Sequence, residues 1–534
     1  MKGNFLYIIF LILLSFSFVD CAKRGNPEGG LRDTIPPVII RAVPENYTTN
    51  FEGNEIRIYF DEYIKLKEVQ KNVIISPPLE NQPTLYPLST SRYIRIVFTD
   101  TLRKNTTYSI NFGNSIVDNN EENPFKYYKY VFSTGSYIDS LKVLGRITDA
   151  TKLLPEEFVT VMLYEVDETY TDSIPFTKKP LYITNTQKTP DVFQIENIKA
   201  GKYRLIALKD NNNNYTFQPK VDKIGFVDEL IDVPTDTTFL LNLFKEIPAY
   251  SLTRPSSVNS NQIVFGFEGK ADSLRIEKLS SVSEDFSYHI TKDTKRDTLN
   301  YWFQPSIDLD TLRFKVTNAF LIDTVEVRQR IAPLDSLRLI PVKTGVLAFD
   351  EAFEVSGNLP LIAFQKDKIQ IMDKDSAAVS FEASLNSYIN LLSLSFEKAE
   401  RQNYTITFLP EAVTEFFGTS NDTVQYKVTT RTVSDYGFMT LNLNNVASYP
   451  IIVQVVNDKG ELMKELYATE NRAFEFENLT PGKYYVRIVY DTNENRIWDT
   501  GNFLERRQPE QIIYYPKLIE VRANWTLNET FILD

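Results

Sequence analysis

The 534-residue sequence predicts an all-β protein made of tandem β-sandwich modules. Runs of five or six residues alternate polar and apolar side chains, as in 55–60, 93–98 and 108–112, and turn residues separate these runs. This spacing is typical of antiparallel strands with one buried face each. Aromatic residues make up 13% of the chain and, with abundant Thr, Ile and Val, they favour strands over helices. A single short helical turn is predicted at 65–71.

The chain opens with Lys2, an uncharged apolar run over residues 5–19, and then Cys21, which is the sole cysteine. The run is too short to span a membrane comfortably, because a spanning helix needs about 20 residues. A cysteine at this junction resembles the acylation site of bacterial lipoproteins, although Asp20 stands where such signals carry a small residue. We therefore expect a signal peptide at 1–20 and a lipidated tether at 21–33. An ordinary secretory peptide or an uncleaved anchor is the alternative.

Internal duplication organises the rest of the chain. Residues 193–214 align without a gap to residues 474–495, and a weaker pair matches 108–112 with 404–408. Each pentapeptide precedes an apolar segment that ends in an acid, Asp118 or Glu415. A two-module unit is therefore repeated around a β-rich middle domain. The predicted domains are 34–135, 136–247, 248–343, 344–432 and 433–534.

Each long copy contains a glycine before Lys-Tyr, at Gly201 and Gly482. We expect positive φ at both glycines, since a tight turn into the next strand would favour a residue without a Cβ. In the second copy, alternate residues Tyr484, Val486 and Ile488 should face one core.

Three short motifs stand out between residues 34 and 135: 35–37 (Ile-Pro-Pro), 60–62 (Phe-Asp-Glu) and 107–112 (Thr-Tyr-Ser-Ile-Asn-Phe). Through these motifs the segment resembles the bacterial Ig-like domain of S-layer proteins and of Bacteroidota lipoproteins. Residues near 140–245 and 433–534 resemble the transthyretin-like, or carboxypeptidase-regulatory, sandwich through their Gly-Lys-Tyr strand starts. These resemblances imply folds and an outer-membrane lipoprotein, but they name no ligand.

Composition excludes several functions. The formal net charge of −12 argues against nucleic acid as a partner, because phosphate contacts need a basic patch. With one cysteine and one histidine, His289, the chain cannot form an internal disulfide or a His-rich zinc site. His289 is interpreted as an ordinary strand residue. Any enzymatic activity is thereby narrowed to carboxylate or substrate-assisted chemistry.

One loop has the spacing of a calcium site. Asp491, Asn493, Asn495 and Asp499 place oxygen atoms at relative positions 1, 3, 5 and 9. The first copy offers a weaker set, namely Asp210, Asn212, Asn214 and Asp222. Neither loop has the glycine or the final glutamate of an EF-hand, so the alternative is an Asn/Asp turn whose side chains bond their own backbone. Calcium is the one cofactor that the sequence suggests.

The tripeptide Asp-(Ser/Thr)-aliphatic, or -Thr, recurs along the chain and resembles the O-glycosylation acceptor of Bacteroidota envelope proteins. A turn aspartate that leads into a strand is the alternative. The candidate acceptors are Thr101, Ser140, Ser173, Ser273, Thr298, Thr311, Thr324, Ser336 and Thr423.

The sequence therefore predicts a non-enzymatic outer-membrane lipoprotein that acts as a scaffold or accessory subunit of an envelope assembly. Its expected partners are the lipid bilayer, through acylated Cys21, and an envelope protein. Two alternatives stay open: a cell-surface glycan-binding protein or adhesin, and a hydrolase with an unrecognised carboxylate pair. The face of the outer membrane that the protein occupies also stays open.

Overall fold

The computed structural model describes residues 33–186, 191–270, 274–281, 283–307, 309–319 and 321–533. Strands dominate these residues, and the protein is all-β, as predicted. The described helical elements are short: α2 (Val69–Asn72), η1 (Ile174–Phe176), η2 (Lys366–Lys368) and η3 (Val433–Asp435). Within the described residues, no helix is long and apolar enough to cross a membrane.

The predicted helical turn at 65–71 is wrong in its first part. Strand β2 (Glu55–Leu66) continues to Leu66, and the helix begins only at Val69. Lys65 pairs with Val117 of β7 (Ile116–Asp118), so its backbone is already used in a sheet ladder. This pairing explains why the charged segment stays extended.

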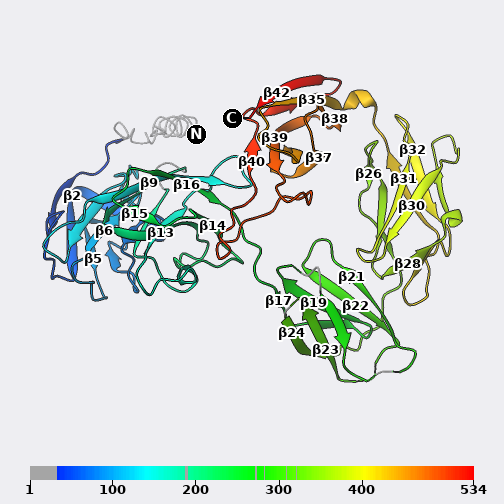
Figure 1. Cartoon of the computed structure of the whole chain (residues 1–534), viewed down its shortest axis with the longest axis horizontal. Coiled ribbons are helices and arrows are strands. Elements are labelled where there is room, and N and C mark those ends of the chain that lie inside the picture. Colours follow the sequence, from blue (N-terminus) through cyan, green and yellow to red (C-terminus); the bar gives the residue numbers. More distant parts are fainter. Residues whose placement is uncertain are drawn as a thin grey trace, which may run out of the picture. The chain divides into compact units, whose positions relative to one another are not determined.

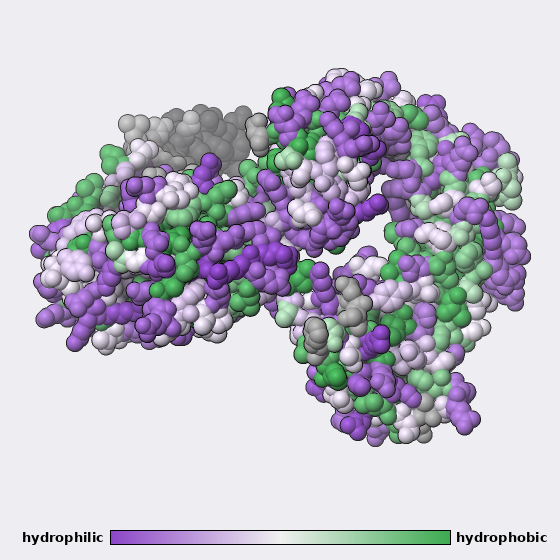
Figure 2. Space-filling view, in the orientation of Figure 1, coloured by the Kyte–Doolittle hydropathy of each residue, from purple (hydrophilic) through white to green (hydrophobic). Residues whose placement is uncertain are grey.

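The chain forms two compact units. The first contains residues up to Lys142 together with 181–188 and 195–200, and the second contains the remainder. Figure 1 shows groups of arrows along each unit, from the blue strands β2, β5 and β6 to the red strand β42. Hydrophilic residues cover much of the face drawn in Figure 2, with scattered hydrophobic patches between them.

The first unit is built around an Ig-like sandwich. One sheet has the order β1-β2-β5-β4, with β7 beside β2, and the other has the order β3-β6-β8. Side chains at alternate positions of β2, such as Ile56, Ile58 and Phe60, are buried in the core between the sheets. Strand β11 packs beside β3 in the same unit. The remaining bounds are β1 (Ile39–Val43), β3 (Ile74–Ser76), β4 (Thr84–Tyr86), β5 (Ser91–Val97), β6 (Thr107–Asn111), β8 (Lys129–Ser133) and β11 (Tyr182–Asn185).

The sandwiches formed by the two long sequence copies, one with strands from β9 to β16 and one with strands from β35 to β42, share one topology. In the first, β10, β13 and β14 form a ladder with β15 beside β13, and β16 runs parallel to β9. In the last, the sheet order is β37-β36-β39-β40 with β41 beside β39, and β42 runs parallel to β35 in the sheet β38-β35-β42. The bounds are β9 (Leu141–Asp149), β10 (Thr160–Glu165), β12 (Val192–Ile198), β13 (Gly201–Lys209), β14 (Lys223–Phe226), β15 (Ile231–Val233), β16 (Thr238–Leu243), β35 (Gly437–Asn444), β36 (Ile451–Asn457), β37 (Leu462–Ala468), β38 (Phe474–Leu479), β39 (Gly482–Tyr490), β40 (Ile512–Tyr514), β41 (Ile519–Val521) and β42 (Thr526–Ile532).

Two further sandwiches lie between them in the sequence, each with its own hydrophobic core. In the middle one, the sheets are β17-β19-β22-β21, with β18 beside β19, and β20-β23-β24. Its strands are β17 (Ser251–Leu252), β18 (Ser256–Asn259), β19 (Gln262–Glu268), β20 (Arg275–Lys278), β21 (Ser287–Lys292), β22 (Thr298–Gln304), β23 (Thr311–Asn318) and β24 (Leu321–Arg328).

The second Ig-like sandwich has sheets of order β25-β27-β31-β30 and β26-β34-β32-β29, with β28 paired to β33. Its strands are β25 (Leu339–Pro341), β26 (Gly345–Val346), β27 (Phe353–Gly357), β28 (Leu361–Phe364), β29 (Ile369–Met372), β30 (Phe381–Asn386), β31 (Leu391–Phe396), β32 (Asn403–Phe408), β33 (Val413–Glu415) and β34 (Val424–Thr429).

The weaker sequence repeat is matched by repeated hydrogen bonds. The Tyr108 hydroxyl accepts the amide of Arg103 at 2.9 Å, and the Tyr404 hydroxyl accepts the amide of Ala399 at 2.7 Å. Both pairs are five residues apart. Asp118 and Glu415, each fully buried at the end of a strand, accept the backbone amides of the turn that follows. The two Ig-like sandwiches therefore use the same local devices.

The predicted positive φ at Gly201 and Gly482 is wrong. Among the described residues with positive φ are instead Asn197 (φ 61°) and Asn478 (φ 57°), which occupy equivalent places before the turn. Asparagine tolerates this left-handed conformation better than most residues with a Cβ. The predicted inward face of β39 is confirmed, since Tyr484, Val486 and Ile488 all belong to the core of the last sandwich.

Candidate functional site at the junction of the repeated sandwiches

Within the second unit, one loop of the last sandwich is longer than its counterpart in the first copy. Gly201 pairs with Val233 across β13 and β15, and the equivalent pair across β39 and β41 is Gly482 with Val521. The loop before β40 therefore carries seven additional residues. Residues 500–508 of this loop, called here the docking segment, contact the module that contains β9 to β16.

An aromatic side chain forms the centre of this contact. Phe503 is 1% exposed, and its ring lies 5.2 Å from that of Phe226 and 6.3 Å from that of Phe176. Phe244, also buried, packs against Phe226 at 6.0 Å. We call Phe176, Phe226 and Phe244 the aromatic socket. A Cβ on Gly501 would lie 2.6 Å from the Phe244 ring, so the close approach of the segment depends on glycine.

Around the socket, backbone and side-chain groups of the docking segment form hydrogen bonds with the other module. The Thr500 hydroxyl donates to the carbonyl of Lys245 at 2.7 Å, and the Phe503 amide donates to the buried carboxylate of Glu246. Burial raises the pKa of Glu246, and the hydrogen bond from Phe503 opposes that rise. Gln508 donates to the Asp228 carboxylate at 2.8 Å. A buried carboxylate that accepts an amide from the other module ties the two sandwiches together, since an unpaired one would be costly.

Two arginines share Asp172 at the edge of the socket. Arg204 is 1% exposed, donates to the carbonyl of Val227 at 2.8 Å, and lies 3.6 Å from the Asp172 carboxylate. Arg506 of the docking segment approaches the same carboxylate at 2.8 Å, and this contact raises the pKa of Arg506. A buried guanidinium is stable only with nearby acceptors. Asp172 therefore connects the interior of one module to the surface of the other.

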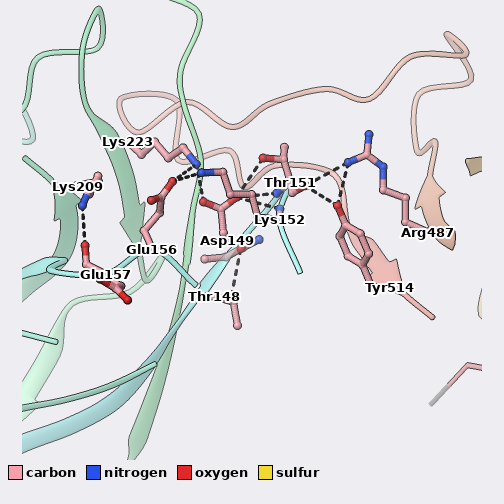
Figure 3. A network of polar contacts seen from close by, with 11 residues as sticks. Thr148, Asp149, Thr151, Lys152, Glu156, Glu157, Lys209, Lys223, Arg487 and Tyr514 are labelled. Atoms are coloured by element: carbon pink, nitrogen blue, oxygen red, sulfur yellow. Dashed lines mark hydrogen bonds and ion pairs between the residues drawn. The ribbon is translucent and has the colours of Figure 1, made fainter. Parts of the chain in front are cut away.

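A second set of polar contacts lies around Thr151 (Figure 3). Its carbonyl accepts hydrogen bonds from Arg487 at 3.1 Å and from the Tyr514 hydroxyl at 2.7 Å. Asp149 accepts the Thr151 amide at 3.0 Å and the Lys223 ammonium at 2.5 Å. The loop that presents the Thr151 carbonyl is thus held from within its own module.

Glu156 completes this network by accepting from Lys223 at 3.0 Å. Burial raises the pKa of Glu156, but Lys152 and Lys223 together outweigh it and bring the pKa to about 2. Burial lowers the pKa of Lys223, but its hydrogen bonds to Asp149 and Glu156 outweigh burial, so the pKa lies above that of an ordinary lysine. Both groups are therefore charged around neutral pH.

The junction residues differ between the two copies. In the gapless alignment, Arg487 stands opposite Ile206, and buried Arg204 stands opposite Tyr485. Only the last sandwich therefore presents the donors to Thr151, and only the first presents the buried guanidinium beside Asp172. The copies share a fold but have different contact surfaces.

The predicted calcium residues lie in the first part of the same long loop. Asp491 is buried and accepts the amides of Asn495 at 3.1 Å and Arg496 at 2.9 Å. The amide nitrogens of Asn493 and Asn495 both donate to Asp499, and the hydrogen bond from Asn493 contributes most to lowering the pKa of that carboxyl. The four residues are brought together, and Asn493 and Asn495 each accept the amide two residues further on, which is the Asx-turn pattern. No cluster of three or more His, Cys, Asp or Glu side chains suited to a metal occurs among the described residues.

In the first copy, the weaker calcium set also satisfies its own backbone. Asp210 accepts the amides of Asn212 and Tyr215, Asn214 accepts the amide of Thr216, and Asp222 accepts the amide of Asn211 at 3.0 Å. Burial raises the pKa of Asp222.

The predicted glycosylation residues are spread along both units. Thr298 is half-buried in β22, and Ser273 lies outside the described residues. The other candidates are exposed: Thr101, Ser140, Ser173, Thr311, Thr324, Ser336 and Thr423. Cys21 also lies outside the described residues. His289 occupies β21, with its ring 5.9 Å from that of Phe416 and Nε2 3.3 Å from the carbonyl of Ser387.

The docking segment was missed at the sequence level. The signal that points to it is the end of the gapless alignment after Asn214 and Asn495, where the second copy gains residues. Phe503 and Gly501 carry no recognisable motif by themselves, and their role depends on an aromatic socket more than 250 positions away.

Comparison with known proteins places part of this fold. Residues 33–134 match the family model of the bacterial Ig-like domain. A search of the curated proteins finds no match. Among solved structures, domains 1–6 of the surface layer protein SbsC are 13% identical, covering 91% of this chain and 67% of that one, with a TM-score of 0.17.

Two other solved structures are similar at comparable levels. The Bacillus anthracis TIE protein is 10% identical, covering 95% of this chain and 76% of that one, with a TM-score of 0.13. Titin domains I67–I69, in a mutated variant, are 11% identical, covering 53% of this chain and 98% of that one, with a TM-score of 0.12. At these identities and TM-scores, the roles of those proteins do not transfer to this chain.

Proposed function

We propose that this protein is a non-enzymatic, outer-membrane lipoprotein that serves as a scaffold or accessory subunit of an envelope assembly. The observation that carries the proposal is the junction itself. The last sandwich contacts three polar groups at this junction: the carboxylates of Glu246 and Asp172 and the carbonyl of Thr151. Such groups fix the arrangement of modules and leave edges and loops for partners.

Other contacts within the second unit support a scaffold role. Lys464 of the last sandwich pairs with Asp350 of the second Ig-like sandwich. Trp302 of the middle sandwich lies 6.3 Å from Phe417 of the second Ig-like sandwich, measured between rings. Ion pairs and aromatic contacts between successive modules restrict their relative motion, as expected for a protein that holds a partner at a set distance from its anchor.

The anchor is tested by replacing Cys21 with alanine. Acylation needs the thiol, and several acyl chains on one residue anchor stably because each buried methylene contributes about 0.8 kcal/mol. We expect Cys21→Ala to release the protein from membranes or to leave an unprocessed precursor. A mature-sized band that stays fully in the membrane fraction would contradict the lipoprotein assignment.

The partner is tested by pull-down from gently solubilised membranes. A scaffold subunit should co-purify with one membrane protein in constant proportion, and Phe503→Ser should weaken that association if the arrangement of modules matters. Leu504→Ser is the matched control, because Leu504 is 56% exposed beside Phe503. Loss of the partner in the control as well would point to a direct contact of the loop and not to module arrangement.

A glycan-binding or adhesin role is the second candidate, favoured by one face of the first sandwich. There the rings of Tyr59 and Tyr93 lie 5.5 Å apart, and the Arg41 guanidinium lies 4.5 Å from the Tyr59 ring centre. Aromatic faces beside cations suit sugars with acidic groups. Retention on an acidic polysaccharide column that is lost in Tyr93→Ala would support this role over the scaffold.

We further propose calcium at Asp491, Asn493, Asn495 and Asp499, and glycans on some of the exposed acceptors. Calcium binding would require the two asparagine amides to turn their oxygens inward, which amides can do by a flip. EDTA should then lower the melting temperature of the calcium-loaded protein, because a ligand bound only to the native state stabilises it. If millimolar calcium shifts the melting temperature neither of this protein nor of Asp491→Ala, the loop is an Asn/Asp turn and not a calcium site. Glycans would be detected by mass spectrometry of the protein from its native envelope.

A further inference from the structure

The docking segment and the aromatic socket form a pair of unlike surfaces on two different modules. We infer that the socket of one copy also accepts the docking segment of a second copy, so that the junction is an exchangeable closure through which copies of this chain assemble. The inference rests on the proposed scaffold function and gives that scaffold a partner, namely another copy of itself.

The docking segment can leave the socket without unfolding its own module. The core of the last sandwich runs from Met439 to Leu533 and is formed by side chains of its two sheets, and Phe503 is not part of it. The seven additional residues that carry the segment lie in the loop between β39 and β40. Undocking therefore costs the contacts of the junction and leaves the cooperative core of the sandwich in place.

No feature of the junction requires the two halves to come from one chain. The bonded residues are 255 to 334 positions apart, and two complete sandwiches separate them in the sequence. The contacts are made by side chains and local backbone groups, which are identical in every copy. Contacts between domains of one chain resemble transient protein–protein interfaces, so a junction that fixes the modules in its closed state still opens as a minor state.

An open molecule would lose the contacts that the docking segment makes with the socket and with Glu246. Phe226 and Phe244 are buried, and Glu246 is 6% exposed while it accepts the Phe503 amide. An exposed aromatic patch with an unpaired carboxylate favours re-association. The docking segment supplies a partner for each part of this surface: Phe503 for the aromatic rings, Arg506 for Asp172 and Gln508 for Asp228. A second copy carries the same segment and is therefore the occupant that fits.

Concentration decides between the closed and the exchanged forms. Linked partners meet at an effective concentration in the millimolar range for flexible connections, so the closed form should prevail in dilute solution. Copies held on one membrane surface are far more crowded, and exchange then competes. Because the two surfaces are unlike, exchange produces a head-to-tail series that closes into a ring or grows as a filament.

Complementation between two disabled variants tests the exchange. The chain from Cys21 onward is made without acyl groups, once with Phe503→Ser, which disables the docking segment, and once with Glu246→Arg, which disables the socket. Each variant should be monomeric at micromolar concentration by light scattering. An equal mixture should form a dimer of twice the mass, because the intact segment of one variant can enter the intact socket of the other.

Controls keep the outcome decisive. The double variant with Phe503→Ser and Glu246→Arg should not join either partner, and Leu504→Ser should behave like the unmodified chain. If Glu246→Arg fails to fold, Glu246→Ala removes the acceptor without adding a charge. A mixture of folded variants that stays monomeric up to millimolar concentration overturns the exchange, and membrane release of Cys21→Ala tests the anchor independently.

Discussion

Replacing Phe503 with alanine should open the junction while every sandwich stays folded. The ring is 1% exposed and packs against Phe226 and Phe176, so its removal loses a nearly complete aromatic contact. Full burial of a Phe side chain is worth about 1.5–3 kcal/mol, and truncation to alanine in a packed site costs about 3–5 kcal/mol. Because the socket can open and admit water, the lower range applies, and we expect about 2–3 kcal/mol.

Amide hydrogen exchange gives the readout for this change. The Phe503 amide donates to Glu246, and the Asn502 and Arg507 backbone groups bond to each other across the loop. A loss of about 2–3 kcal/mol corresponds to roughly 30- to 140-fold faster exchange at residues 501–508, since 1.4 kcal/mol is a factor of ten. Amides of β39 should exchange as before. Unchanged protection of the docking segment, or equal loss of protection in β39, would refute the account of a separable junction.

The remaining predictions concern a turn and a pH dependence. Asn478→Val should destabilise the last sandwich by about 1–2 kcal/mol in urea unfolding, because a β-branched residue resists positive φ, whereas Asn478→Gly should leave the stability nearly unchanged. Gly482→Ala should have a small effect, since a Cβ at Gly482 meets only the Tyr484 ring at 3.5 Å. Glu156 has a folded-state pKa lowered from 4.5 to about 2, so its contribution is present above pH 4.5 and is lost as the pH falls toward 2. Proteolysis of the 149–156 loop should increase over that window by an amount equivalent to about 1 kcal/mol after solvent screening, and Glu156→Gln should remove this pH dependence.

Alternation and repetition in the sequence predicted the fold well. In β2 and β5 the polar–apolar period of two is the direct result of one buried face, so those strands could be placed from residues alone. Strand β6 also lies where the alternation placed it, but it is buried on both faces, so the expectation of one exposed face is wrong there. The offset of 281 predicted two sandwiches of one topology, and the parallel pairs β9–β16 and β35–β42 agree with it. Boundaries were less exact, because β2 continues through the charged residues near Lys65 by pairing with β7.

Turn geometry and the junction could not be predicted in the same way. Positive φ was assigned to the glycines, but the described residues with positive φ are Asn197 and Asn478, four positions before Gly201 and Gly482 and near the ends of β12 and β38. The junction depends on where a loop lies in space. Phe503 is one of 36 phenylalanines, and nothing in its neighbours distinguishes a ring that enters another module from one that stays in its own core.

The parallel strand pairs have a mechanical consequence. In the last sandwich the first strand, β35, and the final strand, β42, are direct neighbours joined over seven residue pairs, and the first copy repeats this arrangement with β9 and β16 over six pairs. A force applied along the chain pulls the two strands of such a pair in opposite directions along their length. The load is then shared by the whole ladder of hydrogen bonds at once, instead of breaking them one after another from an end. These two modules should therefore resist stretching more strongly than their equilibrium stability alone would indicate.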